Sequence, residues 1–584
     1  MKVPYLHWFY NQLDRFRHSE FILGTTLSII VGILAGLSAV LFRWLINFFH
    51  TLFFTDGAEI LSFMGQYYVI VVPAIGGLII GAIIYFTHTS ETKGHGVPEV
   101  MAAVSTAGGR IRTRVAAIKI LVSSICIGSG GSVGREGPIV QIGSAVGSVL
   151  GQRLHLSQDW VKSLVACGAA GGISATFNAP IAGVFFATEV ILGRFLPRRF
   201  GFVVMSSVVA SVIAHSLLGN EITFQIPTYQ LTSHWELLLY FLLGIISAFV
   251  GVLFIRVLNR SEDLFDRLKI PEYLKPGLGG IAIGLLGLYS PFLFGVGYEG
   301  VEQALHGNIG MIMLVTLLLF KIVATSITLG SGGSGGVFAP SLFMGAMFGG
   351  LFGNIANYFL PNITSPSGAY ALVGMAAVFS AAARAPITAI IILFEMTRDY
   401  AIILPLMLAV VVGTFIAHQL NPLSIYGEKL NRRGIKPSTS EEKDVLEKVR
   451  VEEVMTRDYP SVTPDMLLSD VLTMLIESRH HGFPVIDKNG QLTGIITLVD
   501  VETRLSSGEE NLTVADVATT EVITAYPDET LHDVVHRLLG TNEIGRIPIV
   551  ERKDPLKLIG MLRRRDLVKA YAKGLSRSIR EDKE

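Results

Sequence analysis

Long apolar segments, separated by short polar breaks, constrain the fold of this chain more than any other feature. Residues 21–45 are apolar apart from Arg43, and residues 67–86 form a second such segment. Each is long enough to cross the hydrocarbon core of a bilayer, which needs about 20 helical residues. Further long segments lie at 202–218, 237–257, 309–329 and 402–417. Only 16% of the residues are charged, so we expect a multi-span membrane protein and exclude a soluble enzyme, whose surface needs more charge.

Other apolar runs are too short to cross a bilayer, because glycine and proline interrupt them, as in residues 138–150 and 180–192. Short, broken helices at membrane depth are tolerated only where their backbone is buried in protein or lines a polar cavity, and they mark ion sites. The glycine-rich stretch 128–137, GSGGSVGREG, carries Glu136 in apolar surroundings. A charge in such a place is costly unless it is paired or faces an ion, so Glu136 is the first candidate functional residue.

The chain also contains an internal repeat. Residues 128–151 align without a gap with residues 330–353, and residues 167–190 align with residues 373–396, which pairs Glu189 with Glu395. Two homologous halves are the simplest explanation, and transporters built in this way place their site where the halves meet. The predicted fold class is an all-α membrane protein of two homologous halves with broken helices. The number of spans in each half decides whether the halves are inverted, and we expect that they are.

Four motifs follow one another along the apolar part of the chain. They are GHGVPE at 94–99, GREGP at 134–138, GVFAP at 336–340 and the tyrosine of PLSIYGEKL, Tyr426. Together they resemble the CLC family of chloride channels and proton-coupled chloride exchangers. The resemblance implies a cytoplasmic N-terminal helix at 1–20, an anion-conducting transmembrane domain at 21–430 and a homodimer with one pathway in each subunit. It also implies a multi-pass protein of the cell membrane that needs no cofactor and has both termini in the cytoplasm.

The chemistry of these motifs suits a small anion. Helix N-termini offer unpaired backbone N–H groups and a favourable dipole, and glycine loops that run into apolar helices would bring three of them together. The resemblance implies that the backbone N–H groups of Val337 and Phe338 and the hydroxyl of Tyr426 hold chloride. It makes Glu136 the gate, whose carboxylate occupies an anion site until a proton neutralises it. The alternative is that Glu136 pairs with Arg135 as part of the structure.

His95 departs from the family motif, which usually has serine at this position. With the backbone of Gly96, His95 belongs to the expected anion site. An imidazole can donate a hydrogen bond as a serine hydroxyl does, and histidine titrates near physiological pH. We therefore expect His95 to face the inner anion site and to make conduction or selectivity depend on pH. The alternative is that the ring points away and that only the backbone N–H acts.

Val190 is a second departure. In exchangers of the family, a glutamate after the FNAPxAG helix relays protons from the cytoplasmic side, and Val190 takes that position here, directly after Glu189. Valine cannot carry a proton, so this position favours a passive chloride channel gated by Glu136 over a proton-coupled chloride antiporter, which stays the alternative. A shift of one residue would put Glu189 in the relay, although its repeat partner Glu395 favours a structural role.

The composition changes after about residue 431. We expect a charged linker at residues 431–450, a soluble tandem domain at residues 451–572 and a tail at residues 573–584. Each half of the tandem has a helix with apolar residues every three or four, followed by two short β-branched strands: PVID and GIIT, then IPIV and LIGML. This resembles a pair of cystathionine-β-synthase (CBS) modules, which we expect to form a cytoplasmic α/β domain that modulates the pathway.

Pairs of CBS modules often bind adenine nucleotides, and a Thr-x-x-Asp after the second strand contacts the nucleotide in the family. Thr497 and Asp500 match this pattern, and Asp566 matches it in the second module, where Arg563 replaces the threonine and puts that site in doubt. ATP, ADP or AMP is the expected ligand if the pair binds one. The alternative is a dimerisation and coupling module without a ligand.

Other classes of protein fit less well. Magnesium carriers also join CBS modules to membrane segments, so a CBS-regulated cation transporter is a remote alternative, but it would need several carboxylates at membrane depth. We expect no metal site, because Cys126 and Cys167 lie apart in apolar segments. The net charge of zero gives no attraction to nucleic acid. The glycine loops lack the Lys-Ser/Thr of a phosphate-binding loop, and we expect no enzymatic activity.

Overall fold

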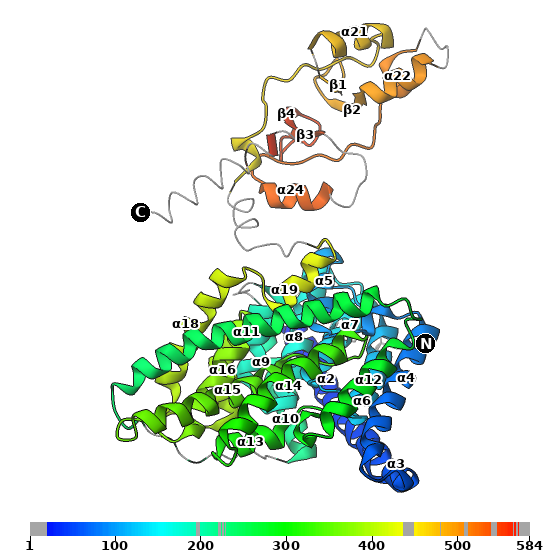
Figure 1. Cartoon of the computed structure of the whole chain (residues 1–584). Coiled ribbons are helices and arrows are strands. Elements are labelled where there is room, and N and C mark those ends of the chain that lie inside the picture. The colour runs from blue at the N-terminus through cyan, green and yellow to red at the C-terminus, as the bar shows by residue number, and fades with distance from the viewer. Residues whose placement is uncertain are drawn as a thin grey trace, which may run out of the picture. The chain divides into compact units, whose positions relative to one another are not determined.

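The chain forms two units, Met1–Pro437 and Ser438–Glu584 (Figure 1). The computed structural model describes residues 20–193, 199–219, 224, 227, 229, 231–435, 449–478, 480–506, 512–538, 546–563, 566, 567 and 570. Almost all of the helix expected at 1–20, most of the linker expected at 431–450 and the tail expected at 573–584 lie outside these residues.

The first unit, which we call the membrane unit, is helical throughout. Its first half contains α2 (Glu20–His50), η1 (Thr51–Asp56), α3 (Gly57–Ile60), η2 (Ser62–Tyr67), α4 (Tyr68–Thr87), η3 (Ser90–Thr92), α5 (Val97–Thr106), α6 (Thr113–Gly128), α7 (Glu136–Arg153), α8 (Gln158–Phe177), α9 (Pro180–Phe186), η4 (Ala187–Leu192) and α10 (Phe200–Leu218). Its second half contains α11 (Glu236–Arg267), α12 (Lys275–Gly287), η5 (Pro291–Leu293), α13 (Tyr298–Leu305), α14 (Met311–Gly330), α15 (Phe338–Phe359), α16 (Ser367–Ala383), α17 (Pro386–Thr397) and α18 (Ile403–Leu420), and α19 (Ile425–Arg432) follows.

Long and short apolar helices alternate in this unit. Seven helical segments of the described chain are long and apolar enough to cross a membrane, and shorter apolar helices lie between them. The breaks have a local cause. Asn178 and Arg384 adopt left-handed φ angles of 55° and 58° that end α8 and α16. Pro180 and Pro386 then begin α9 and α17, where a first helical turn tolerates the missing N–H. The predicted multi-span fold with broken helices is confirmed.

The helix boundaries follow the sequence repeat. α6 and α14 end at Gly128 and Gly330, and α7 and α15 begin at Glu136 and Phe338, so both pairs are shifted by 202 residues. Gly134 and Gly336, which are equivalent in the repeat, donate backbone hydrogen bonds to each other's carbonyl oxygens at 2.8 and 2.6 Å. A two-fold relation between the halves produces such reciprocal pairs.

The halves are also inverted. In Figure 1, α5 lies beside α19 at one side of the membrane unit, whereas α13, its counterpart in the second half, lies at the opposite side. Glycine lets equivalent helices approach closely in each half. A Cβ atom on Gly143 of α7 would collide with the carbonyl oxygen of Gly168 on α8, and Gly345 and Gly374 repeat this contact between α15 and α16.

The second unit contains two similar modules. The first has α21 (Leu468–Ser478), β1 (Gly482–Ile486), β2 (Leu492–Thr497) and α22 (Leu498–Ser506), and the second has α24 (Leu531–Leu538), β3 (Arg546–Val550) and β4 (Leu558–Arg563). Between them lies α23 (Val514–Val517), and Val514 packs in the core of the first module. β1 pairs antiparallel with β2, and β3 with β4. The predicted helix and strand pairs are therefore present. The short helix η6 (Val451–Glu453) precedes the first module, but Val451 packs in the core of the second.

Candidate anion site

Three buried glycine loops meet in the membrane unit. The loop before α5 bonds the loop before α15, through Gly94 N–H to the carbonyl of Gly333 at 3.0 Å and Gly335 N–H to that of Gly94 at 3.3 Å. The loop before α7 bonds the same segment through the reciprocal pair of Gly134 and Gly336. The N-termini of α5, α7 and α15 are thus held together, although they lie far apart in the sequence. Each offers backbone N–H groups without an intrahelical partner.

Glu136 lies in this convergence and is 1% exposed. It opens α7, yet its Oε2 accepts a hydrogen bond from the backbone N–H of Ala339, in the first turn of α15, at 3.4 Å. Its Oε1 accepts one from the hydroxyl of Tyr298, the first residue of α13, at 3.4 Å. The carboxylate of the first half therefore occupies the N-terminus of a helix of the second half, a position that suits an anion.

Arg135 points elsewhere. Its Nη2 donates to the carbonyl oxygen of Thr176 at 3.5 Å, and its guanidinium carbon lies 5.5 Å from the centre of the Tyr298 ring. No ion pair within 4 Å joins its guanidinium to Glu136, both of which are described. The arrangement therefore gives no support to Glu136 as a simple structural partner of Arg135.

Val337 and Phe338 form the start of α15 and are each 2% exposed. The Phe338 ring packs against the rings of Phe177 and Phe379, with centroid distances of 5.0 and 4.2 Å. These contacts fix the first turn of α15, and thereby the direction of its backbone N–H groups.

His95 is 3% exposed, and neither of its ring nitrogens has a hydrogen-bond partner among the described residues. Its ring centre lies 6.5 Å from that of Tyr426. Gly96 follows with a φ of 76°, and a Cβ there would lie 2.7 Å from the carbonyl oxygen of Gly137. An unpartnered buried imidazole is unusual, because buried polar groups normally find a partner. The ring therefore has hydrogen-bonding capacity to offer a ligand in this place.

Two protein-family models match this chain. A family model described as voltage gated chloride channel matches residues 76–418. The chain belongs to the CLC family. A second model, the CBS domain, matches residues 451–507 and 514–573, so the second unit is a pair of CBS modules, which we call the CBS unit.

Relatives and solved structures agree with this placement. A putative chloride channel protein ClcB-like from Ralstonia nicotianae is 35% identical over 62% of this chain and 85% of its own length. An H(+)/Cl(-) exchange transporter ClcA from Vibrio campbellii is 34% identical over 69% of this chain and 88% of its own length. The crystal structure of a slow cyanobacterial Cl-/H+ antiporter has a TM-score of 0.65 and 27% identity, covering 70% of this chain and 97% of the antiporter. This CLC protein is an integral multi-span membrane protein of a chloride-transporting family.

The position expected for a proton relay holds Val190, which is 6% exposed. The neighbouring Glu189 is already engaged. Its Oε1 accepts from the backbone N–H of Ile387 at 3.1 Å, and its Oε2 accepts from the N–H and the hydroxyl of Thr388 at 2.9 and 2.6 Å. The carboxylate thus caps the N-terminus of α17 in the second half.

Glu395 makes the equivalent contacts in the opposite direction. It accepts from the backbone N–H groups of Ile181 and Ala182 in α9, at 3.0 and 2.7 Å. The two glutamates therefore cap each other's half, as the repeat suggested, and this geometry favours a structural role for Glu189.

Lys119 is a residue of the site that sequence reasoning missed. It is 0% exposed on α6, and its Nζ donates to the carbonyl oxygens of Thr92 and Gly94 at 3.0 and 2.8 Å. The ammonium group holds the loop that carries His95 and also adds positive charge close to the expected anion. A lysine within an apolar segment was the available signal.

Lys321 is its counterpart on α14, shifted by 202 residues, and is also 0% exposed. Its Nζ donates to the carbonyl oxygens of Leu293 and Gly295 at 3.3 and 3.0 Å, and so holds the loop before Tyr298. Tyr298 was missed as well. Its signal is the short match of GHGVPE at 94–99 with GVGYEG at 295–300.

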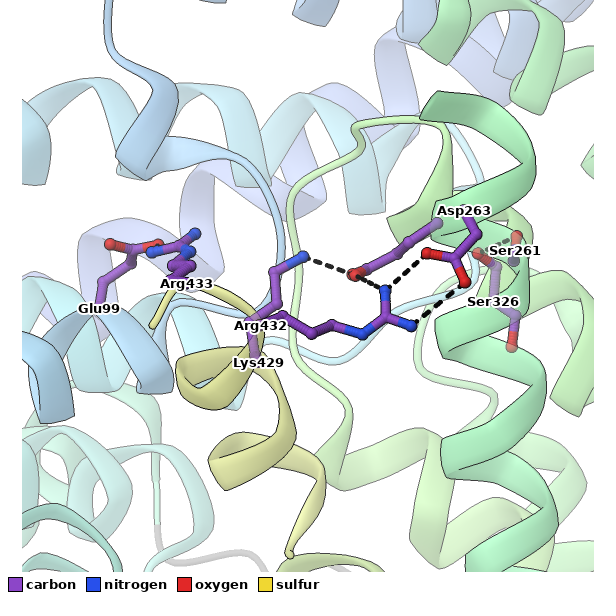
Figure 2. Close-up of polar contacts among 8 residues, drawn as sticks. Glu99, Ser261, Asp263, Ser326, Lys429, Arg432 and Arg433 are labelled. Carbon is purple, nitrogen blue, oxygen red and sulfur yellow. Dashed lines mark hydrogen bonds and ion pairs between the residues drawn. The ribbon is translucent and has the colours of Figure 1, made fainter. Parts of the chain in front are cut away.

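The helix that carries Tyr426 is tied to both halves. Ion pairs join the end of α19 to α5 and α11: Arg433 with Glu99 at 2.6 Å, Lys429 with Glu262 at 2.6 Å and Arg432 with Asp263 at 2.9 Å. Figure 2 shows the pair of Arg432 and Asp263. α19 is also the last described helix before the CBS unit. A movement of α19 would therefore act on Tyr426 and on the helix that follows His95.

In the CBS unit, the candidate nucleotide residues bond to one another. Asp500 Oδ2 accepts from the N–H and the hydroxyl of Thr497 at 2.8 and 2.6 Å, which caps α22. Arg563 donates to both carboxylate oxygens of Asp566, at 2.7 and 3.0 Å, and to the hydroxyl of Thr456 at 2.7 Å. A nucleotide at the second module would have to share or displace this ion pair.

Proposed function

We propose that this CLC protein exchanges chloride for protons across the membrane, with Glu136 as the gate. The observation that carries the proposal is the Glu136 carboxylate at the N-terminus of α15. There it competes with an anion for the same backbone N–H groups. One negative charge excludes another until a proton removes it, so protonation of Glu136 would admit chloride. The names of the Vibrio exchanger and the cyanobacterial antiporter support exchange over passive conduction.

Chloride in this proposal binds between the helix N-termini. The backbone N–H groups of Val337 and Phe338, the hydroxyl of Tyr426 and the loop of His95 and Gly96 surround it. Helix dipoles and neutral donors bind an anion without a full positive cage, which would hold it too tightly to release it. The unpartnered ring of His95 supports its inclusion.

The position of the family's proton relay holds Val190, and Glu189 is engaged at α17. We propose that His95 contributes to the anion site on the inner side, because it lies in the loop held by Lys119 and beside Tyr426. We further propose that the imidazole makes conduction or selectivity depend on pH.

A passive chloride channel is the second candidate, and Val190 is the observation that favours it. Purified protein in liposomes, held in a chloride gradient with and without a pH gradient, distinguishes the two. Exchange moves the reversal potential away from the chloride equilibrium potential when the pH gradient is imposed. A reversal potential that ignores the pH gradient would identify a channel, and the absence of chloride flux would overturn both candidates.

His95→Ser tests the role of the imidazole, because serine retains a hydroxyl donor and loses the titratable group. We expect chloride transport to continue while its anion selectivity and its dependence on pH change. His234→Ser changes an exposed histidine and serves as the matched control. Unchanged selectivity and pH dependence in His95→Ser would exclude a role for the ring.

The homodimer, the cell membrane and the cytoplasmic termini are proposed from the family resemblance. We also propose that the CBS unit modulates transport and binds ATP, ADP or AMP at Thr497, Asp500 and Asp566. Calorimetry on the full chain with each nucleotide tests this binding. Heat in the wild type that is lost in Asp500→Asn would support it, and no heat with any of the three would leave the CBS pair as a coupling module.

A further inference from the structure

The candidate nucleotide carboxylates of the two CBS modules have different partners. Asp500 in the first module accepts from the N–H and the hydroxyl of Thr497, a small neutral residue. Asp566 in the second module accepts from Arg563 three times: from its backbone N–H at 3.1 Å, from Nε at 2.7 Å and from Nη2 at 3.0 Å. The side chains of Arg563 and Asp566 are 16% and 9% exposed. A charged group of the chain thus already occupies the acceptor that a ligand would need at Asp566.

Arg563 also holds the segment that precedes the first module. We call this segment, residues 449–456, the strap. Nη2 of Arg563 donates to the hydroxyl of Thr456 at 2.7 Å. The backbone N–H groups of Thr456 and of Met561 on β4 donate to each other's carbonyl oxygens, both at 2.9 Å. Earlier in the strap, Val451 packs in the core of the second module. One guanidinium therefore joins the candidate ligand carboxylate to the strap.

The contacts of Arg563 define what a ligand at Asp566 must carry. To replace the guanidinium, the ligand must donate hydrogen bonds to the carboxylate, as ribose hydroxyls do. The displaced guanidinium then needs a new anion, because a poorly exposed charge without its partner is strongly unfavourable. Phosphate oxygens suit arginine, whose planar fork binds them with two hydrogen bonds. A nucleotide carries both groups. A nucleoside lacks the phosphates, and an inorganic polyphosphate would bring negative charge toward Asp566.

We infer that Arg563 selects the ligand of the second module and that binding of this ligand releases the strap. A nucleotide replaces both sides of the ion pair, because its ribose hydroxyls bind Asp566 and its phosphates bind Arg563. The guanidinium then leaves Thr456, and the strap loosens from β4. This inference rests on the proposed binding of a nucleotide by the CBS unit, and it adds which ligands are accepted and what their binding changes. The replacement of threonine by Arg563 therefore retains the site and restricts its ligands to nucleotides.

Hydrogen exchange of the full chain tests the inference, with the backbone amides of Thr456 and Met561 as the readout. We expect ATP to speed their exchange about tenfold, the size of one lost charge-assisted hydrogen bond. Adenosine and inorganic tripolyphosphate, each at the same concentration, should leave the exchange unchanged. In Arg563→Thr, exchange should be fast without a ligand, and ATP should add nothing further. Arg552→Thr, at an exposed arginine of the same module that pairs with Asp528, is the control and should match the wild type.

Calorimetry with ATP on the same protein separates the inference from the proposed function on which it rests. Heat of ATP binding without faster exchange would overturn the release of the strap and leave nucleotide binding intact. Faster exchange with adenosine alone or with tripolyphosphate alone would overturn the requirement for both groups. These comparisons use the unmodified protein, so they hold even if Arg563→Thr does not fold. Absence of both heat and faster exchange would count against nucleotide binding itself, and the inference would fall with it.

Discussion

The two halves of the membrane unit share one frame and differ in the chemistry placed on it. In both halves, a buried lysine holds the loop before a short helix, and a glutamate caps the N-terminus of a helix in the opposite half. Glycines in both halves also let paired helices approach closely. The first half places Glu136 at the start of its long helix, where the second half places Val337 and Phe338. The shared frame is thus present in both halves, whereas the buried carboxylate at the start of the long helix is present only in the first.

The loops held by the two lysines diverge in the same way. The first carries His95 beside Tyr426, and the second carries Val296 at the equivalent position and leads into Tyr298. Because the halves are inverted, the two loops lie on opposite sides of Glu136, the proposed gate. One side therefore has a titratable ring at the expected anion site, and the other has a hydroxyl on the carboxylate.

Glu136→Gln should have the largest effect on transport, because it removes the carboxylate that only the first half carries at this position. Glutamine has the same shape but cannot ionise, so proton coupling should disappear while chloride flux continues. The reversal potential in liposomes, with and without a pH gradient, measures the loss. Glu299→Gln, at an exposed glutamate in α13, is the control. Coupling that persists in Glu136→Gln would exclude Glu136 as the shared site of proton and chloride.

Glu189→Gln and Glu395→Gln test the symmetry of the frame. Each replaces a carboxylate that accepts backbone N–H groups of the other half. We expect each variant to lower the free energy of unfolding by about 1.5–3 kcal/mol, the range for hydrogen bonds to charged groups. Thermal unfolding of the purified protein should give similar shifts for both. Proton coupling should survive in Glu189→Gln, and its loss would return Glu189 to the relay.

Lys119→Met and Lys321→Met distinguish the contributions of the two loops to chloride binding. Loss of Lys119 frees the His95 loop and removes a positive charge, so the half-saturating chloride concentration should rise about tenfold. Loss of Lys321 acts on the Tyr298 loop and should change this value by less than about twofold. Concentration dependence of chloride flux is the measurement, with size-exclusion profiles to confirm folding. An equal rise in both would mean that the lysines act only through the common fold.

Tyr298→Phe should have the smallest effect. It removes the 3.4 Å hydrogen bond to Glu136 and retains the ring under Arg135. A neutral donor at this distance contributes little, so we expect the flux at fixed pH and chloride to rise about threefold as the carboxylate is released. Tyr400→Phe, 72% exposed in the membrane unit, is the control. An unchanged flux would mean that the hydroxyl does not restrain the gate.

Much of the architecture could be predicted before the fold was known. Apolar length predicts the spans, and the glycine and proline breaks predict the short helices. The repeat predicts two halves, and the pairing of Glu189 with Glu395 points to their shared role. In the CBS unit, helix periodicity and β-branched runs predict both modules. These are local patterns, so they can be read along the chain.

The partners of the charged residues could not be predicted in the same way. Nothing near Glu136 in the sequence indicates that Ala339 and Tyr298 would reach its two oxygens. Lys119 and Lys321 stand out as charges in apolar segments. The carbonyl oxygens that accept their hydrogen bonds, however, lie in loops more than 20 residues away in the sequence. The environment of the His95 ring and the contact of Arg563 with Thr456 have no sequence pattern either, because segments distant in the sequence form each of them.

The sequence by itself determined a membrane protein of two repeated halves, with a charged residue in one glycine loop and a pair of CBS modules following in the chain. Periodicity, length and glycine positions act locally, and this is why they suffice for that much. Only the tertiary structure decided that the Glu136 carboxylate lies on the N-terminus of α15 and that Glu189 caps α17. It also decided that neither ring nitrogen of His95 has a hydrogen-bond partner among the described residues. The physical reason is that hydrogen bonding and burial depend on which segments are in contact. The inverted packing of the halves determines those contacts.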